Sequence, residues 1–204
     1  MNKNSMEKYY KNLMSIEQKT SRKVGWRDEA AQIIRFQQLY KLIENENNPN
    51  IADLGCGLAT FYGFLKEQKR NFNYTGYDIS KSMIANAKKI INDNNCELLL
   101  IDNIAKIKEH DFIILSGVFN MKKEVKDNVW LDYILNQLEV INHKSRKGFG
   151  FNLLTSYSDS EFKDDELFYA EPDFFFNYCK KKFSKNVALL HDYEEYDFTV
   201  IVRK

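Results

Sequence analysis

The residues best suited to chemistry lie in one short stretch, Asp53-Leu54-Gly55-Cys56-Gly57, which ends an apolar run. Two glycines so close together allow a sharp turn and let a ligand approach the backbone. Asp53 places a carboxylate beside that turn, where it attracts a cationic group. The stretch therefore predicts a strand, a tight turn and a helix built around a small ligand.

Two further acids stand at the ends of the next two apolar runs. Asp78 follows Asp53 by 25 residues, and Asp102 ends the third run. A carboxylate at the end of the second strand can accept hydrogen bonds from both hydroxyls of a ribose, and one at the end of the third could accept from an exocyclic amine. Open α/β sheets bind ligands at this edge, so the three acids predict a ligand that contains a nucleoside.

The glycine pattern discriminates between nucleoside ligands. A dinucleotide fingerprint requires G-x-G-x-x-G, but Thr60 stands at its last position, and no Gly-Lys-Ser/Thr of a phosphate-binding loop occurs. S-adenosylmethionine has no phosphate but carries a sulfonium and an ammonium. Asp53 suits these cations, and the sequence therefore favours this ligand over a dinucleotide in a short-chain dehydrogenase.

The elements that would position these residues alternate along the chain. Apolar runs predict strands at 50–54, 73–79, 96–101, 111–117, 148–154, 186–191 and 197–202, and periodic patterns predict helices at 27–44, 60–68, 81–92, 122–142 and 173–183. This order predicts a doubly wound α/β fold with a mostly parallel, seven-stranded, Rossmann-like sheet. The last two strands are too close for a crossover helix, so they predict a C-terminal antiparallel hairpin.

Composition narrows the function classes. Lys plus Arg number 30 against 29 Asp plus Glu, a net charge of +1, which disfavours a nucleic-acid partner. Three cysteines far apart indicate neither a disulfide framework nor a zinc site, and we predict no metal. The N-terminus shows no apolar leader, and no run approaches the ~18 apolar residues of a membrane span. These features predict a soluble, cytoplasmic protein.

The motifs DLGCG, YDIS, LIDN and SGVFN resemble, in order and spacing, those of class I S-adenosylmethionine-dependent methyltransferases, over about residues 25–204. Ala59 departs from the family pattern, since many members have a third glycine there. The segment GWRDEAAQIIRFQQL is similar to the entry segment of a bacterial subgroup of small stand-alone enzymes. The resemblance implies contacts with S-adenosyl-L-methionine by Asp53, Gly55 and Gly57 (methionine part), Arg35 (carboxylate), Asp78 and Ile79 (ribose), Asp102, Asn103 and Ile104 (adenine) and Ser116 (near the sulfonium).

The acceptor is less defined. His191, in HDYEEY at the ligand-binding edge, is the candidate general base, although it could equally be a rim histidine bonded to a neighbour. Tyr193 and Asn120 are further catalytic candidates, and the acidic, aromatic segment 156–176 is either a lid or a solvated loop. We expect a small-molecule acceptor with a hydroxyl, carboxyl or amine group, such as a sugar or surface-polysaccharide precursor.

Two alternatives remain at the level of the sequence. One is a non-catalytic module that binds adenosylmethionine, and the other is an RNA methyltransferase. Residues 25–204 are expected to form a single domain. Residues 1–24 are expected to form a helical extension that could close over the site.

Overall fold

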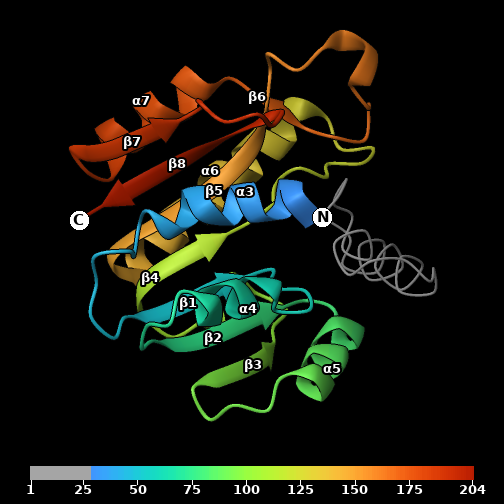
Figure 1. Cartoon of the computed structure of the whole chain (residues 1–204). Helices are drawn as coiled ribbons and strands as arrows, with labels where there is room; N and C mark the ends of the chain where they lie inside the picture. Colours follow the sequence, from blue (N-terminus) through green and yellow to red (C-terminus); the bar gives the residue numbers. More distant parts are fainter. Residues whose placement is uncertain (1–28) are drawn as a thin grey trace.

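The computed structural model describes residues 29–204, which form one mixed sheet flanked by helices on both faces (Figure 1). The strands are β1 (Asn50–Leu54), β2 (Asn73–Asp78), β3 (Cys96–Leu100), β4 (His110–Leu115), β5 (Ser145–Thr155), β6 (Tyr169–Ala170), β7 (Asn186–Leu190) and β8 (Asp197–Arg203). Their order is β3-β2-β1-β4-β5-β8-β7, with the short β6 paired to the end of β5. Only β8 runs antiparallel to its neighbours, β5 and β7. The predicted doubly wound sheet with a terminal hairpin is confirmed.

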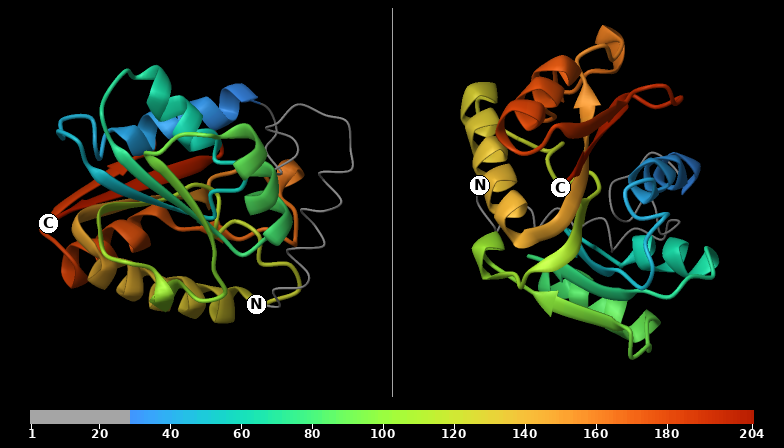
Figure 2. Two further views of the ribbon diagram at one scale, coloured as in Figure 1. Left: turned by 90° about the horizontal axis from the view of Figure 1, so that it is seen from below. Right: turned by 90° about the vertical axis from the view of Figure 1, so that its left-hand side faces the viewer.

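Two helical layers cover the sheet (Figure 2). α3 (Glu29–Tyr40), α4 (Thr60–Glu67) and α5 (Lys81–Ile90) pack on one face, and α6 (Asp127–Lys144) and α7 (Pro172–Lys182) pack on the other. Two short 3-10 turns, η1 (Ile104–Lys106) and η2 (Ser160–Phe162), lie in the connections. Side chains alternate between the faces, so that Phe112 and Ile114 of β4 join the α3 side and Ile113 joins the α6 side. Burial on both faces explains why the middle strands are continuously apolar.

Besides shifts of element ends, such as the helix predicted over 27–44 that ends at Tyr40, the structure differs from the sequence prediction at two places. The two-residue β6 makes an eighth strand, which is too short to leave a pattern. The predicted helix 122–142 begins only at Asp127, because the N–H groups of Lys122 and Lys123 both donate to the carbonyl of Glu166. That bond pattern holds the loop after β4 against the loop after β5.

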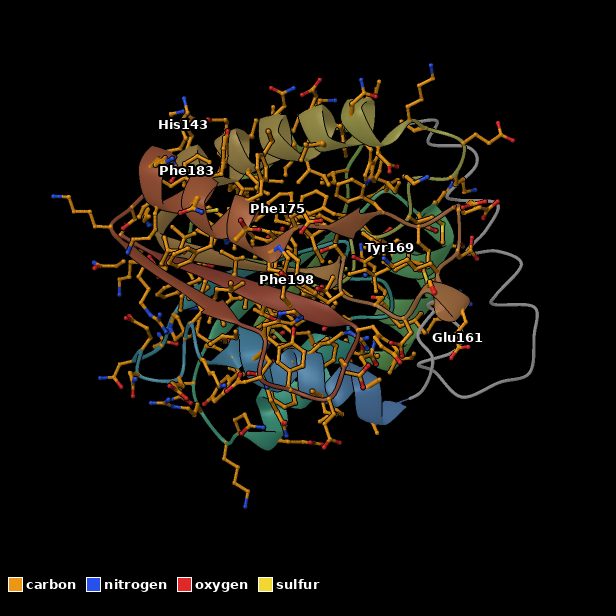
Figure 3. The ribbon with its side chains drawn as sticks, turned by 90° about the horizontal axis from the view of Figure 1, so that it is seen from above. His143, Glu161, Tyr169, Phe175, Phe183 and Phe198 are labelled. Carbon is orange, nitrogen blue, oxygen red and sulfur yellow. The ribbon has the colours of Figure 1, made fainter. Side chains whose placement is uncertain are left out.

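The parallel strands β1 to β5 all end at one edge of the sheet, which we call the carboxyl edge. The hairpin loop 191–196 lies at the same edge, since Asp197 of β8 pairs with Leu154 near the end of β5. Figure 3 shows Glu161 and Tyr169 at this end of the molecule and His143 and Phe183 at the other. His191 therefore lies at the predicted edge.

None of the helices within residues 29–204 combines the length and apolarity that crossing a membrane requires. The predicted N-terminal extension, residues 1–24, lies outside the described residues, and its role as a lid stays a prediction.

Candidate active site

The turn after β1 is shaped by backbone conformations that favour glycine. Gly55 (φ 73°) and Gly57 (φ 57°) lie in the left-handed region, and the N–H of Gly55 donates to the carbonyl of Tyr77 at 2.7 Å. A Cβ on Gly55 would stand 2.7 Å from a methyl group of Val118. Ala59 (φ 57°) is also left-handed, which explains why many relatives of this pattern place glycine there.

Asp78 joins this turn to the end of β2. Its carboxylate accepts from the N–H of Gly57 at 2.8 Å and from the N–H of Ser80 at 2.7 Å. The side chain is 5% exposed, and burial raises the pKa of its carboxyl although these bonds lower it. Asp78 therefore fixes the turn and also presents a carboxylate to the cavity beside it.

A cavity of about 330 Å³ opens at the carboxyl edge between the ends of β1 to β4 and the first turns of α6. Seven of the ten predicted cofactor residues line it: Gly55, Asp78, Ile79, Asp102, Asn103, Ile104 and Ser116. Val118, Phe119, Trp130, Tyr133 and Gln137 form walls that the sequence prediction did not include. The cavity is mostly apolar and lined by one buried acid, Asp78, as suits a nucleoside.

At the end of the cavity where the sequence predicts adenine, Asp102 and Asn103 already have partners in the protein. Asp102 is exposed and accepts from the ammonium of Lys106 at 2.7 Å, and Asn103 accepts from the N–H of Ala105 at 2.9 Å to begin η1. Both residues line the cavity, and their contacts with adenine stay predictions.

A second, smaller cavity of about 50 Å³ adjoins the first and shares Gly55, Ser116 and Gly117 with it. Two further predicted residues, Asp53 and Gly57, line it. Asp53 is 3% exposed and accepts a 2.5 Å hydrogen bond from the hydroxyl of Tyr74. Burial raises the pKa of the Asp53 carboxyl to about 7. A cationic group bound beside it would favour the ionised carboxylate and would be bound more tightly for that reason.

Asn152 supports the floor that the two cavities share. Its Oδ1 accepts from the N–H of Gly117 at 2.7 Å, and its Nδ2 donates to the hydroxyl of Ser116 at 3.5 Å. The side chain is 1% exposed in the middle of β5. The sequence analysis did not select Asn152. Its position between Phe151 and Leu153 in an apolar run was a usable signal, because an amide buried in such a strand needs hydrogen-bond partners.

Comparison with known proteins identifies the family. The model of the methyltransferase small domain matches residues 31–145, more than half of the chain. A Mycobacterium tuberculosis protein, Rv1506c, named as a candidate methyltransferase, is 40% identical over 164 residues, which cover 79% of this chain and 98% of the relative. The chain belongs to the methyltransferase small domain family. The predicted class I methyltransferase, with S-adenosyl-L-methionine as its cofactor, is confirmed at the level of the family.

More distant matches agree on the fold. The magnesium protoporphyrin IX methyltransferase of Synechocystis PCC 6803, crystallised with S-adenosylhomocysteine, superimposes with a TM-score of 0.69 at 12% identity, with full coverage of both chains. The N-terminal domain of EvdMO1, crystallised with S-adenosylhomocysteine and D-fucose, gives 0.61 at 15% identity over 100% of this chain and 97% of that one. A tRNA (guanine-N(7)-)-methyltransferase of Clostridium perfringens is 25% identical over 168 residues, 78% of this chain and 74% of the relative.

Arg35 of the methyltransferase lies outside both cavities. Its guanidinium donates to the carboxylate of Asp197 and, at 3.0 Å, to that of Glu195. All three side chains are buried, and they join α3 to the start of β8. Its predicted contact with the ligand carboxylate stays a prediction, and the geometry gives Arg35 two protein carboxylates instead.

The three catalytic candidates also lie outside both cavities. His191 is exposed, with its ring 6.0 Å from the rings of Tyr157 and Phe198. The Tyr193 hydroxyl bonds with that of Thr199 at 2.9 Å, and burial raises the pKa of Tyr193 far above its usual value, so it stays protonated. A role for His191 or Tyr193 in the reaction stays a prediction.

Asn120 helps to fasten the loops after β4 and β5 together. Its Oδ1 accepts from the N–H of Leu154 at 3.3 Å, and its carbonyl accepts from the N–H of Phe168 at 2.8 Å. Met121 and Leu167 form an antiparallel bridge beside it. This part of segment 156–176 is therefore fastened to the loop after β4, and whether it acts as a lid, like the catalytic role of Asn120, stays a prediction.

Proposed function

We propose that this enzyme transfers the methyl group of S-adenosylmethionine to a small-molecule acceptor that enters from the carboxyl edge of the sheet. The observation that carries the proposal is the pair of adjoining cavities, because their sizes and acids match the two parts of the cofactor. The larger cavity suits the adenosyl part, with Asp78 at the ribose. The smaller one suits the amino-acid part, with Asp53 at the ammonium. The shared floor at Ser116 and Gly117 would then lie near the sulfonium.

The bound cofactor supplies an activated methyl group, so the protein has to bind, orient and exclude water. The apolar wall of Val118, Phe119 and Trp130 would shield the adenosyl part from solvent. Asn152 would hold the floor in place from below. A hydroxyl or amine acceptor also needs a proton acceptor, and His191 is the candidate at this edge.

The charge of the carboxyl edge favours a small acceptor over RNA. Exposed acids crowd the loops 156–168 and 191–196; we call this set the acidic rim, and its members are Asp159, Glu161, Asp164, Asp165, Glu166, Asp192 and Glu194. Lys163 is the one cation in those two loops, and its ammonium donates to the carbonyl of Ser156. The facing loop carries Lys122, Lys123 and Lys126, of which Lys122 is bound to the carboxylate of Asp127 and the carbonyl of Asp165. The seven acids of the rim outnumber these lysines and Lys163. A rim of this sign repels a polyanion.

The second candidate function is RNA methylation, which the similarity to the tRNA methyltransferase favours. One experiment separates the two: transfer of labelled methyl from S-adenosylmethionine to total tRNA, and to a panel of hydroxylated, carboxylated and amine metabolites, across a salt series. We expect label in one chemical class of the panel and none in tRNA. Labelling of tRNA that falls steeply with salt would overturn the small-molecule proposal.

A further inference from the structure

The smaller cavity is lined by a polar side chain that no other group within residues 29–204 engages. Gln32 of α3 is 4% exposed and lines the cavity, and its amide has no hydrogen-bond partner among residues 29–204. The amide faces the cavity and is not cut off from it, so water or a ligand there can bond to it. Such a group is expected where a ligand supplies the missing bonds.

The same cavity is lined by the first two residues of α4, Thr60 and Phe61. The N-cap position before them is Ala59, which provides no side-chain hydrogen bond. The first N–H groups of the helix therefore lack the usual cap, and they carry the positive end of the helix dipole. The hydroxyl of Thr60 adds a further donor at this helix start.

The smaller cavity offers no cationic side chain from residues 29–204 to a bound carboxylate. No lysine or arginine among these residues lines it, and Asp53 is the one carboxylic acid that does. Arg35, one turn further along α3, is bound to Asp197 and Glu195. A carboxylate that enters this cavity thus meets neutral donors and a helix start, and not a guanidinium.

We propose that Gln32, Thr60 and the first N–H groups of α4 bind the α-carboxylate of the cofactor, while Asp53 binds its α-ammonium. The inference rests on the proposed function and makes Gln32 a specificity-determining residue. The described lining combines one carboxylic acid, Asp53, with neutral donors from Gln32 and Thr60. It therefore selects a ligand whose amino-acid end carries both charges.

The test compares two ligands by calorimetry: S-adenosylhomocysteine and its decarboxylated analogue, which keeps the thioether and the ammonium but lacks the carboxylate. Wild type should bind S-adenosylhomocysteine more tightly. Gln32→Leu should lower the affinity for S-adenosylhomocysteine by about tenfold or more and leave the affinity for the analogue unchanged. Gln32→Glu should weaken it further, since a second carboxylate repels the first.

Matched variants keep the test independent of folding. Thr60→Val should repeat the selective loss, and Thr60→Ser, which keeps the hydroxyl, should restore affinity. Gln37→Leu, at an exposed position of the same helix, should change neither affinity. Selective loss at Gln32 alone supports the amide, and loss at both positions supports the whole subsite.

Three outcomes would overturn the inference. Equal weakening of both ligands by Gln32→Leu would show that the amide only supports the fold. Equal binding of both ligands by wild type would show that no carboxylate is recognised. A selective loss in Arg35→Lys and none in the Gln32 variants would return the carboxylate to Arg35. Failure of wild type to bind either ligand would instead sink the proposed function itself.

Discussion

Asp53 carries a buried carboxyl group whose pKa burial raises from 3.8 to about 7. A raised acid contributes stability that is fully present below the unfolded pKa and is lost as pH rises through the folded pKa. The window of loss is therefore about pH 4 to 7. A bound ammonium favours the ionised form, so the ligand recovers part of this loss. Asp53 therefore lowers the free energy of unfolding of the free protein at neutral pH and strengthens the binding of a cationic ligand.

Asp53→Asn should separate these effects, because an amide oxygen can still accept from Tyr74. We expect its free energy of unfolding to exceed that of wild type by about 2–4 kcal/mol at pH 8 and by little near pH 4. Affinity for S-adenosylhomocysteine should rise from pH 6 to 8 in wild type only, with a proton released on binding. Urea melts and calorimetry in two buffers measure both quantities. Wild-type affinity that does not change over this range would contradict the role of Asp53.

Asn152 fixes the floor shared by the cavities, and its removal leaves the partly buried N–H of Gly117 without this acceptor. Asn152→Leu should lower the free energy of unfolding by about 1–3 kcal/mol and weaken cofactor binding. Asn136→Leu, on an exposed position of α6, is the control. If Asn152→Leu binds cofactor like wild type once folded, the floor does not depend on this amide.

At the scale of elements, the turn between β1 and α4 depends on Gly55, where a side chain would meet Val118 at 2.7 Å with the backbone at φ 73°. Gly55→Ala should therefore weaken cofactor binding strongly and lower the melting temperature. Gly63→Ala, in α4 with nothing within 4 Å of the added atom, should raise stability by about 0.5–1 kcal/mol. Equal effects of the two substitutions would contradict the account of the turn.

The buried ion pairs of Arg35 connect α3 to the C-terminal hairpin. Arg35→Met leaves the carboxylates of Asp197 and Glu195 buried without this cation, at a cost of about 3–5 kcal/mol near neutral pH. The cost should shrink at low pH, because burial raises the pKa of the Asp197 carboxyl and it takes up a proton there. Urea melts at pH 5 and pH 8 measure it. Unchanged stability together with lost cofactor affinity would instead support the ligand role predicted from the sequence.

The same elements show what the sequence can and cannot predict. Strand positions followed from apolar runs, because strands buried on both faces leave an unambiguous pattern. The start of α6 did not follow, because the bonds of Lys122 and Lys123 to Glu166 are long-range. Asp53, Asp78 and Ser116 lie at cavities, since strand ends fix their edge. Arg35 does not, because its partners Glu195 and Asp197 are about 160 residues away and no local pattern reveals them.

At the scale of the whole molecule, a net charge of +1 does not describe the acidic loops at the carboxyl edge. The acidic rim lies at the carboxyl edge, whereas Lys180, Lys181 and Lys182 end α7 at the opposite edge. Figure 3 shows these two ends by Glu161 and Phe183. Composition alone disfavours a polyanionic partner only weakly, and the folded arrangement strengthens that argument at the entrance to the site.

The most direct test of the central claim is calorimetric titration of the protein with S-adenosylhomocysteine, beside NADH and beside the Asp78→Asn variant. We predict binding near the micromolar range, about −8 kcal/mol, with no binding of NADH and a large loss in the variant. The melting temperature of the variant shows whether it is folded. Absence of S-adenosylhomocysteine binding by wild type, or equal binding of NADH, would contradict the claim that these cavities hold a methyl-donor cofactor.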